Sequence, residues 1–362
     1  MGFAKVISAD SHVMEPRDLW FKALAKRYGE HAPQLRSEHL GKPGTFFYTG
    51  AQVIKVTETD RDAQKIGLQA AGYDPAVRLE FQNRAGVQGE VLYATLMLLI
   101  MRGEQRAVVR AAAQVFNDWL AEFCSHDNKR FFGVGMIPMD DPDWAEAELH
   151  RIAKKGLRGA MIHLAPPEGC APYHNELYDC FWAAAQDLDL PITLHIVAGR
   201  FPDPLHFHTP KEQEDAPRVL LSILFEVMNE LANEFIFGGI LDRFEKLKLV
   251  CSEFEVSWIP NFMWRLDQMQ EDFDGRLNLR QLKMKASDYM KTRIWHGIID
   301  DPLGAEAIKA IGIGQVMWGS DFPHVRSIGL DAHSRLAKLF DGLNPADQAK
   351  LIEGNVCGVY KI

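Results

Sequence analysis

Short runs of apolar, often β-branched residues alternate along the chain with longer amphipathic stretches. This alternation is typical of parallel βα units, in which a helix follows each strand and covers the sheet. Eight such runs match the number of strands in a closed barrel, so we expect an α/β fold of the (β/α)8 TIM-barrel type. The expected strands are Ala4–Ala9, Glu90–Ala94, Phe132–Ile137, Gly159–Leu164, Ile192–Val197, Leu247–Ser252, Arg293–Gly297 and Gln315–Gly319.

The stretches between these runs carry apolar residues at helical spacing. Residues 104–127 place Val108, Ala112, Phe116 and Leu120 on one face,. Residues 145–155 follow Asp140-Asp141-Pro142, a pattern that favours the start of a helix,. We expect these helices, and a third over residues 217–232, to pack on the outside of the barrel.

Two segments do not fit the βα repeat. Residues 29–80 form a long insertion after the first strand, with an aromatic cluster at Phe46, Phe47 and Tyr48. Residues 199–216 form a loop rich in Pro and His after the fifth strand. Nothing in the composition separates a second domain, so we expect residues 1–362 to form a single domain. Both segments should lie at the carboxyl ends of the strands, where such barrels place lids and specificity loops.

Charge and composition exclude several classes of protein. The net charge is -9, which disfavours binding to nucleic acid or to an acidic membrane surface,. We expect no leader sequence, since only a short apolar run precedes Asp10, and no membrane span, since no stretch reaches 18 apolar residues,. The five cysteines form no CxxC pair. We therefore expect a cytoplasmic protein with free thiols, which forms a homodimer or a higher homo-oligomer and binds a small molecule.

Polar residues end several of the expected strands. Asp10 and His12 follow the first strand two positions apart, a spacing that points both side chains to the same side, with Ser11 pointing away,. His195 ends the fifth strand and Asp321 follows the eighth. Because the carboxyl ends of barrel strands meet at one face, core packing does not explain this coincidence. We interpret Asp10, His12, His195 and Asp321 as ligands of a divalent metal, for which zinc, manganese or iron are suitable ions.

Further residues are candidates for the same face. His163 lies at the end of the fourth strand, and Glu253 and His324 follow the sixth and eighth. We expect these three residues to act in catalysis together with Asp321. His296 belongs to the seventh strand and is a weaker candidate. The pair His206 and His208 is a competing candidate for metal ligands, but we expect it to line the entrance, because no strand fixes its direction. We expect Glu15 and Arg17 to be cap and salt-bridge residues and Trp258 to belong to the pocket wall. Arg200 is a candidate to face the pocket, which would favour a decarboxylase.

The residues around these positions resemble the amidohydrolase superfamily, and in particular its amidohydrolase-2 branch. That branch includes aminocarboxymuconate-semialdehyde decarboxylase and aromatic-acid decarboxylases. The likeness extends over nearly the whole chain, and its most specific motifs lie at the two ends. The motifs are Ala9-Asp10-Ser11-His12-Val13-Met14-Glu15-Pro16, Asp74-Pro75, Arg78-Leu79, Phe116-Asn117-Asp118-Trp119, Leu190-Pro191-Ile192-Thr193-Leu194-His195, Leu247-Lys248-Leu249, Trp258-Ile259-Pro260 and Gly319-Ser320-Asp321-Phe322-Pro323-His324.

The resemblance implies the same four metal ligands, with two departures. Asp10 stands where many relatives have the first residue of an HxH or ExH motif. Glu253 stands where aminocarboxymuconate-semialdehyde decarboxylase has a histidine that resembles a general acid/base. Glu253 can take over that role, act as a further metal ligand, or anchor the loop.

Four functions are open at this point. The leading hypothesis is hydrolysis by a metal-activated water, with Asp321 handling the proton of that water. The main alternative is non-oxidative decarboxylation of an aromatic or enoic acid, with Asp321 protonating the carbon. A third is an oxygenase with two metal ions, the second held by His163, His296 and Glu253. A fourth, a non-catalytic subunit, is disfavoured by the intact ligand set.

Overall fold

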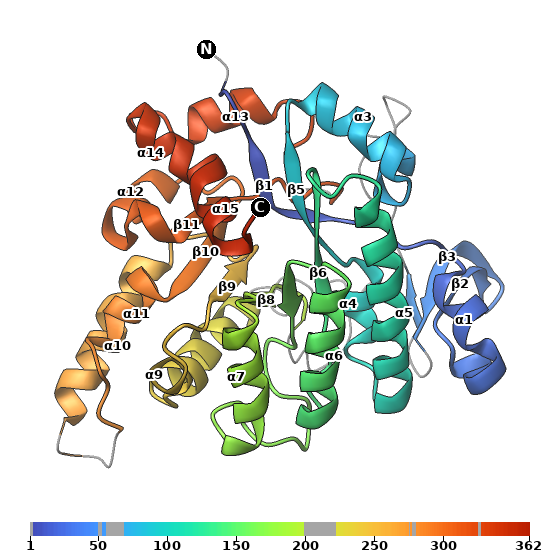
Figure 1. Ribbon diagram of the computed structural model, residues 1–362, viewed down its shortest axis with the longest axis horizontal. Coiled ribbons are helices and arrows are strands. Elements are labelled where there is room, and N and C mark those ends of the chain that lie inside the picture. Colours follow the sequence, from blue (N-terminus) through green and yellow to red (C-terminus); the bar gives the residue numbers. More distant parts are fainter. Residues whose placement is uncertain are drawn as a thin grey trace.

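The computed structural model describes residues 3–49, 53–55, 69–198, 222–274, 276, 280–324 and 327–362. Eight parallel strands form a sheet in the order β1-β5-β6-β7-β8-β9-β10-β11. Figure 1 shows these strands at the centre of the molecule, with the helices around them. The strands are β1 (Ile7–His12), β5 (Gly89–Tyr93), β6 (Phe131–Met136), β7 (Gly159–Met161), β8 (Ile192–His195), β9 (Leu249–Ser252), β10 (Ile294–Ile298) and β11 (Val316–Trp318).

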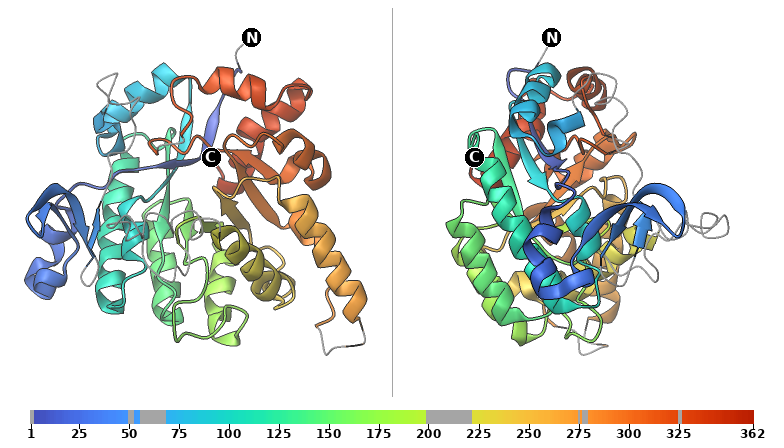
Figure 2. Two further views of the ribbon diagram at one scale, coloured as in Figure 1. Left: turned by 180° about the vertical axis from the view of Figure 1, so that it is seen from behind. Right: turned by 90° about the vertical axis from the view of Figure 1, so that its right-hand side faces the viewer.

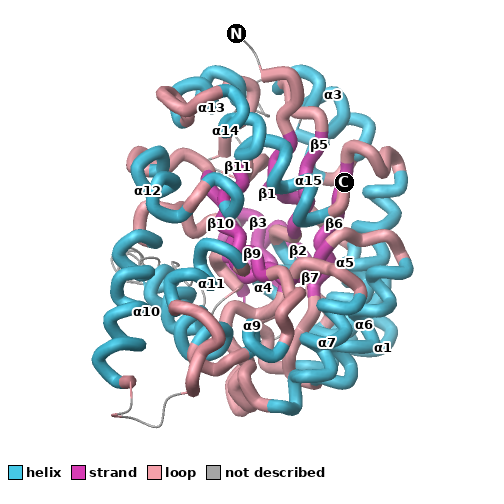
Figure 3. The backbone as a smooth tube through the Cα atoms, turned by 60° about the vertical axis from the view of Figure 1, so that its left-hand side comes forward, coloured by secondary structure: helices cyan, strands magenta, loops and turns pink. Residues whose placement is uncertain are grey.

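The sheet closes on itself where the first strand meets the chain that follows the last one. The amide of His12 donates to the carbonyl of Phe322 at 2.7 Å, and the amide of Asp321 donates to the carbonyl of Asp10 at 2.8 Å. Figure 3 shows β11, β1 and β5 side by side, enclosed by helices. The predicted (β/α)8 barrel is therefore confirmed, and all eight expected strands are present.

The helices begin and end where simple capping rules place them. In α3, α6 and α14 the caps Asp74, Asp141 and Asn344 accept backbone N–H groups and are each followed by proline,. The apolar face of α5 is buried against the barrel, as its spacing predicts. The helices are α1 (Leu19–Tyr28), α3 (Pro75–Ala85), α4 (Leu96–Ile100), α5 (Arg106–Ser125), α6 (Pro142–Lys154), α7 (Asp179–Asp187), α9 (Ile240–Arg243), α10 (Ile259–Phe273), α11 (Ala286–Thr292), α12 (Gly304–Ile311), α13 (Ala332–Leu339), α14 (Pro345–Ala349) and α15 (Asn355–Tyr360). Residues 222–230 are also helical.

Strand boundaries differ from the prediction at two places that matter for the site. β1 begins at Ile7 and runs to His12, so that Asp10 and His12 belong to the strand itself. β7 ends at Met161, which leaves His163 in the loop that follows. A bulge between Ser8 and Ser11 breaks the regular pairing of β1 with β5. The Ser11 hydroxyl bonds to Ser8 and Ser320, away from the neighbouring Asp10 and His12 side chains.

The insertion after β1 forms a small antiparallel sheet of its own, made of β2 (Gln34–His39), β3 (Lys42–Tyr48) and β4 (Val53–Lys55). Phe47 in β3 is fully buried and packs against Trp20 of α1, whose indole donates to the carbonyl of Ala112 in α5. In Figure 2 this blue segment stands at the edge of the molecule. Since Ala112 lies in the first half of α5, the small sheet adjoins the carboxyl side of the barrel, as expected.

Two further expectations can be compared with the structure, and a third cannot. The loop at residues 199–216 lies outside the described residues. All five cysteines are free, as predicted. Within the described ranges, no helix is long and apolar enough to cross a membrane.

Candidate metal centre

Two strands bring three of the predicted ligands together. Asp10 and His12 come from β1, and His195 is the last residue of β8. The Nε2 atoms of His12 and His195 lie 3.4 and 3.6 Å from Oδ1 of Asp10, and all three side chains are buried. Their ligand atoms lie within 4.8 Å of one another, a spacing that suits a shared metal ion.

Backbone carbonyls fix the orientation of both imidazoles. Nδ1 of His12 lies 2.6 Å from the carbonyl of Ala94, and Nδ1 of His195 lies 2.8 Å from the carbonyl of Ile196. Because a carbonyl only accepts hydrogen bonds, each Nδ1 carries the proton in this arrangement. The Nε2 atoms of both rings therefore face Asp10, and Nε2 is available to a cation wherever it carries no proton.

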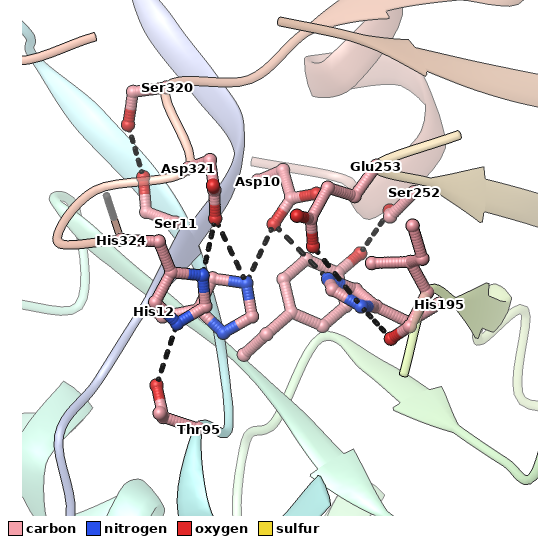
Figure 4. A network of polar contacts seen from close by, with 12 residues as sticks. Asp10, Ser11, His12, Thr95, His195, Ser252, Glu253, Ser320, Asp321 and His324 are labelled. Carbon is pink, nitrogen blue, oxygen red and sulfur yellow. Dashed lines mark hydrogen bonds and ion pairs between the residues drawn. The ribbon is translucent and has the colours of Figure 1, made fainter. Parts of the chain in front are cut away.

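A second group of side chains adjoins the first. Asp321 follows β11, with its Oδ1 3.5 Å from Nε2 of His12 and 2.7 Å from Nδ1 of His324. Glu253 follows β9, and its carboxylate lies 3.7 Å from Nδ1 of His195. Figure 4 shows these side chains converging from separate strands. Asp321, Glu253 and His324 form, with His12, a group whose ligand atoms also lie within 4.8 Å of one another.

Strained backbone aims two of the carboxylates. Glu253 has φ 65° and Asp321 has φ 54°, left-handed values that residues other than glycine adopt at a cost,. Val197, two residues after His195, has φ 71°. Such strain gathers at functional sites, where the surrounding structure enforces it.

Four buried polar atoms of this cluster have no hydrogen-bond partner within the part of the chain that the structure describes. They are both carboxylate oxygens of Asp10, Nε2 of His12 and Nε2 of His195. Leaving such atoms without a partner is costly, and a cation placed among them would satisfy them together. The residues present therefore fit a divalent metal ion.

The electrostatics point the same way. Burial opposes the charge of Asp10, but the nearby His195 and His12 outweigh it and lower its pKa. Burial likewise disfavours charge on His195, yet Asp10 and Glu253 raise its pKa to about 9. Burial and the neighbouring Asp321 raise the pKa of Glu253 to about 8. Without a metal, a proton on His195 balances Asp10, and a cation would replace that proton.

His324 links Asp321 to a residue that the sequence reading missed. Its Nδ1 contacts Asp321, and its Nε2 lies 3.2 Å from the hydroxyl of Thr95. Burial would lower the pKa of His324, but the hydrogen bond to Asp321 and the charge of that residue raise it. Thr95 is the second residue after the end of β5, so the rule that found the other site residues, a polar residue just after a buried strand, applies to it as well.

His163 is separate from the cluster. Its Nδ1 accepts the amide of Met139 at 3.3 Å, and its Nε2 lies 2.8 Å from the carbonyl of Met101. Burial lowers its pKa to about 4, which keeps the ring neutral. Both ring nitrogens are thus hydrogen-bonded to backbone groups. The predicted catalytic role of His163 stays a prediction.

His296 is separate from the cluster too. Its Nε2 lies 2.9 Å from the carbonyl of Met290. Among the described residues, neither His296 nor His163 belongs to a group able to hold a metal ion. The structure therefore does not bring them to Glu253 as the two-metal hypothesis requires.

The other candidates have structural contacts or lie outside the described residues. The carboxylate of Glu15 accepts the amides of Thr95, Leu96 and Met97 and so caps α4. The indole of Trp258 donates to carbonyls of its own turn. Arg200, His206 and His208 lie outside the described residues.

Tyr93 packs against the imidazoles of His12 and His195, and its hydroxyl contacts further buried hydroxyl groups. Tyr93 of β5 packs against His12 and His195, with ring centroids 6.0 and 5.2 Å apart. Its hydroxyl lies 2.7 Å from that of Tyr360 in α15 and accepts from Ser252 at 3.2 Å. The last helix of the chain is thereby tied to the site, a role that no local sequence pattern indicates.

The chain is similar in sequence to known decarboxylases. A γ-resorcylate decarboxylase from Rhodococcus jostii is 24% identical over 302 residues, which cover 79% of this chain and 87% of that protein. The corresponding enzyme from Polaromonas sp. is 26% identical over 259 residues, which cover 68% and 75% of the two chains. These relatives are enzymes that remove a carboxyl group.

Solved structures show the same fold. An amidohydrolase from Mycobacterium avium subsp. paratuberculosis superimposes with a TM-score of 0.80 at 18% identity, over 99% of this chain and 98% of that one. The profile of the amidohydrolase family matches residues 68–361. This chain therefore belongs to the amidohydrolase family.

Proposed function

We propose that this protein is a metal-dependent decarboxylase that removes carbon dioxide from a small aromatic acid without oxidation. The observation that carries the proposal is the buried group of Asp10, His12 and His195, which adjoins Asp321 and leaves its ligand atoms without protein partners. The relatives named above, which are decarboxylases, favour this reaction over the hydrolysis that we gave first from sequence.

Asp10, His12, His195 and Asp321 are the residues that would hold the ion. A divalent cation bound there would supply positive charge that attracts an anionic aromatic acid. A dihydroxybenzoic acid decarboxylase from Polaromonas contains manganese together with 2-nitroresorcinol, at a TM-score of 0.67 and 19% identity. We therefore propose manganese rather than zinc for this protein.

The protein's own residues supply the proton. When the bond between the ring carbon and the carboxyl carbon breaks, carbon dioxide leaves, the electron pair stays on the ring carbon, and that carbon takes up a proton. Asp321 is the proposed donor, because its carboxylate faces the cluster and is held by His324 at 2.7 Å. His324, in contact with Thr95, is placed to return a proton to Asp321,.

The proposal is tested by carbon dioxide release. The manganese-loaded protein is incubated with 2,6-dihydroxybenzoate and 5-carboxyvanillate, the acids named for two similar folds. We expect release of carbon dioxide from at least one aromatic acid, abolished by Asp321→Asn but not by Asp341→Asn, at an exposed position. Cleavage of esters, lactones or amides with no carbon dioxide from any acid would instead support hydrolysis.

A further inference from the structure

Glu253 lies beside the metal centre and has a strained backbone conformation. It directly follows β9 and has φ 65°. A non-glycine residue in this region is destabilised unless its surroundings compensate. Its carboxylate lies 3.7 Å from Nδ1 of His195, the nitrogen that does not face Asp10, and its place near the ion comes from the group that it forms with His12, Asp321 and His324.

Glu255 shows what a structural carboxylate in the same loop does. It also has a left-handed backbone, with φ 56°. Its two oxygens accept the amides of Ile299 and Asp300 at 3.0 and 3.2 Å, and so tie this loop to the end of β10. Glu253 accepts no such backbone bond among those of the described residues, although both carboxylates leave the same turn. Anchoring of the loop therefore accounts for the strained backbone of Glu255, but it does not account for that of Glu253.

The position of His12 relates the two groups of side chains. Its Nδ1 is committed to Ala94, so only Nε2 can bind an ion. Nε2 lies 3.4 Å from Asp10 on one side and 3.5 Å from Asp321 on the other, and both groups include it. An ion bound to this nitrogen is thus within reach of carboxylates from β1, from the β9 loop and from the β11 loop.

We propose that Glu253 is a direct ligand of the metal ion, which adds a third carboxylate to those of Asp10 and Asp321. This inference rests on the metal centre of the proposed function. Three carboxylates and two imidazoles form an oxygen-rich set, which suits manganese with five or six ligands better than four-coordinate zinc. The cation in turn balances three negative side chains that otherwise repel one another.

The test is a metal titration of the folded, metal-free protein by calorimetry, with Mn²⁺ and Zn²⁺ in turn. Glu253→Gln keeps the shape of the side chain and removes its charge. Glu253→His introduces the histidine that the resemblance places here in aminocarboxymuconate-semialdehyde decarboxylase. Glu122→Gln, on an exposed turn of α5, is the matched control. Thermal unfolding of each variant checks that it is folded.

We expect Glu253→Gln to raise the Kd for Mn²⁺ by about tenfold or more, with Glu122→Gln unchanged. Glu253→His should shift the preference from Mn²⁺ to Zn²⁺ by about tenfold. A wild-type protein that binds two ions, one of which Glu253→Gln removes, would place Glu253 at a separate ion and overturn the shared five-ligand set. Folded variants at position 253 with wild-type affinities for both ions would overturn it and leave the proposed function intact. A wild-type protein that binds neither ion would overturn both.

Discussion

The amide of Asp321 donates to the carbonyl of Asp10 at 2.8 Å, so the backbones of two proposed metal ligands are hydrogen-bonded to each other. One belongs to the first strand of the barrel and the other follows the last. The bond both closes the barrel and sets the distance between their carboxylates. The same hydrogen bond therefore determines barrel closure and the geometry of the site. Substitutions where β1 meets the chain after β11 should affect both the stability of the barrel and metal binding.

Gly319 is the residue that permits this close approach. A Cβ atom at this position would lie 2.5 Å from Cβ of Asp10 and 3.0 Å from its backbone nitrogen. We expect Gly319→Ala to destabilise the protein by about 1–3 kcal/mol and to weaken metal binding, because β1 must move. Urea unfolding and metal analysis measure the two effects. Gly314→Ala, with nothing within 4 Å, is the control, and equal behaviour of the two variants would contradict the prediction.

Arg78 links β1 to Glu90 of β5. It is fully buried, donates to both oxygens of Glu90 at 2.6 and 2.9 Å, and reaches the carbonyl of His12 at 2.9 Å. Arg78→Met leaves a buried carboxylate without its charged partner, so we expect a loss of about 3–5 kcal/mol in unfolding free energy. Replacing Glu90 by methionine as well should recover part of that loss. A double variant no more stable than the single one would argue against the pair as the cause.

His163 tests whether a predicted catalytic residue is structural. His163→Phe removes its bonds to the backbone of Met101 and Met139 and leaves both groups buried. We expect the unfolding free energy to fall by about 2 kcal/mol, while metal content stays at the wild-type level. A variant as stable as wild type that no longer releases carbon dioxide would show that His163 acts in catalysis after all.

The same histidine predicts a pH dependence. Burial lowers the pKa of His163 to about 4 in the folded protein, whereas in the unfolded chain this pKa is about 6.5,. The stability that neutral His163 contributes is therefore fully present above about pH 6.5 and is lost as the pH falls toward 4. The destabilisation caused by His163→Phe should therefore be smaller at pH 5.5 than at pH 7.5, by about 1 kcal/mol. Urea unfolding of metal-free protein at both values measures this. A difference that grows at the lower pH would mean that His163 is charged in the folded state.

Most of the barrel was predictable because its strands are buried on both faces and read as apolar runs. The same pattern located Asp10, His12, His195 and Asp321, since each lies at or just after the end of a strand.

The features that could not be predicted from the sequence are the hydrogen-bond partners of the site residues and their backbone angles. His163 follows a strand as well, but only the structure shows its ring engaged with backbone on both sides. The left-handed backbones of Glu253 and Asp321 have no sequence signature, because neither residue is glycine. The expected homo-oligomer and the cytoplasmic location remain predictions.

The central claim is that Asp10, His12 and their neighbours hold a divalent metal ion. It is tested most directly by the metal content of protein purified without chelator, measured beside Asp10→Asn. We predict about one divalent ion per chain in the wild-type protein, in keeping with an open catalytic metal site, and a large loss in the variant. A folded wild-type protein without stoichiometric metal, or an unchanged content in Asp10→Asn, would contradict the account.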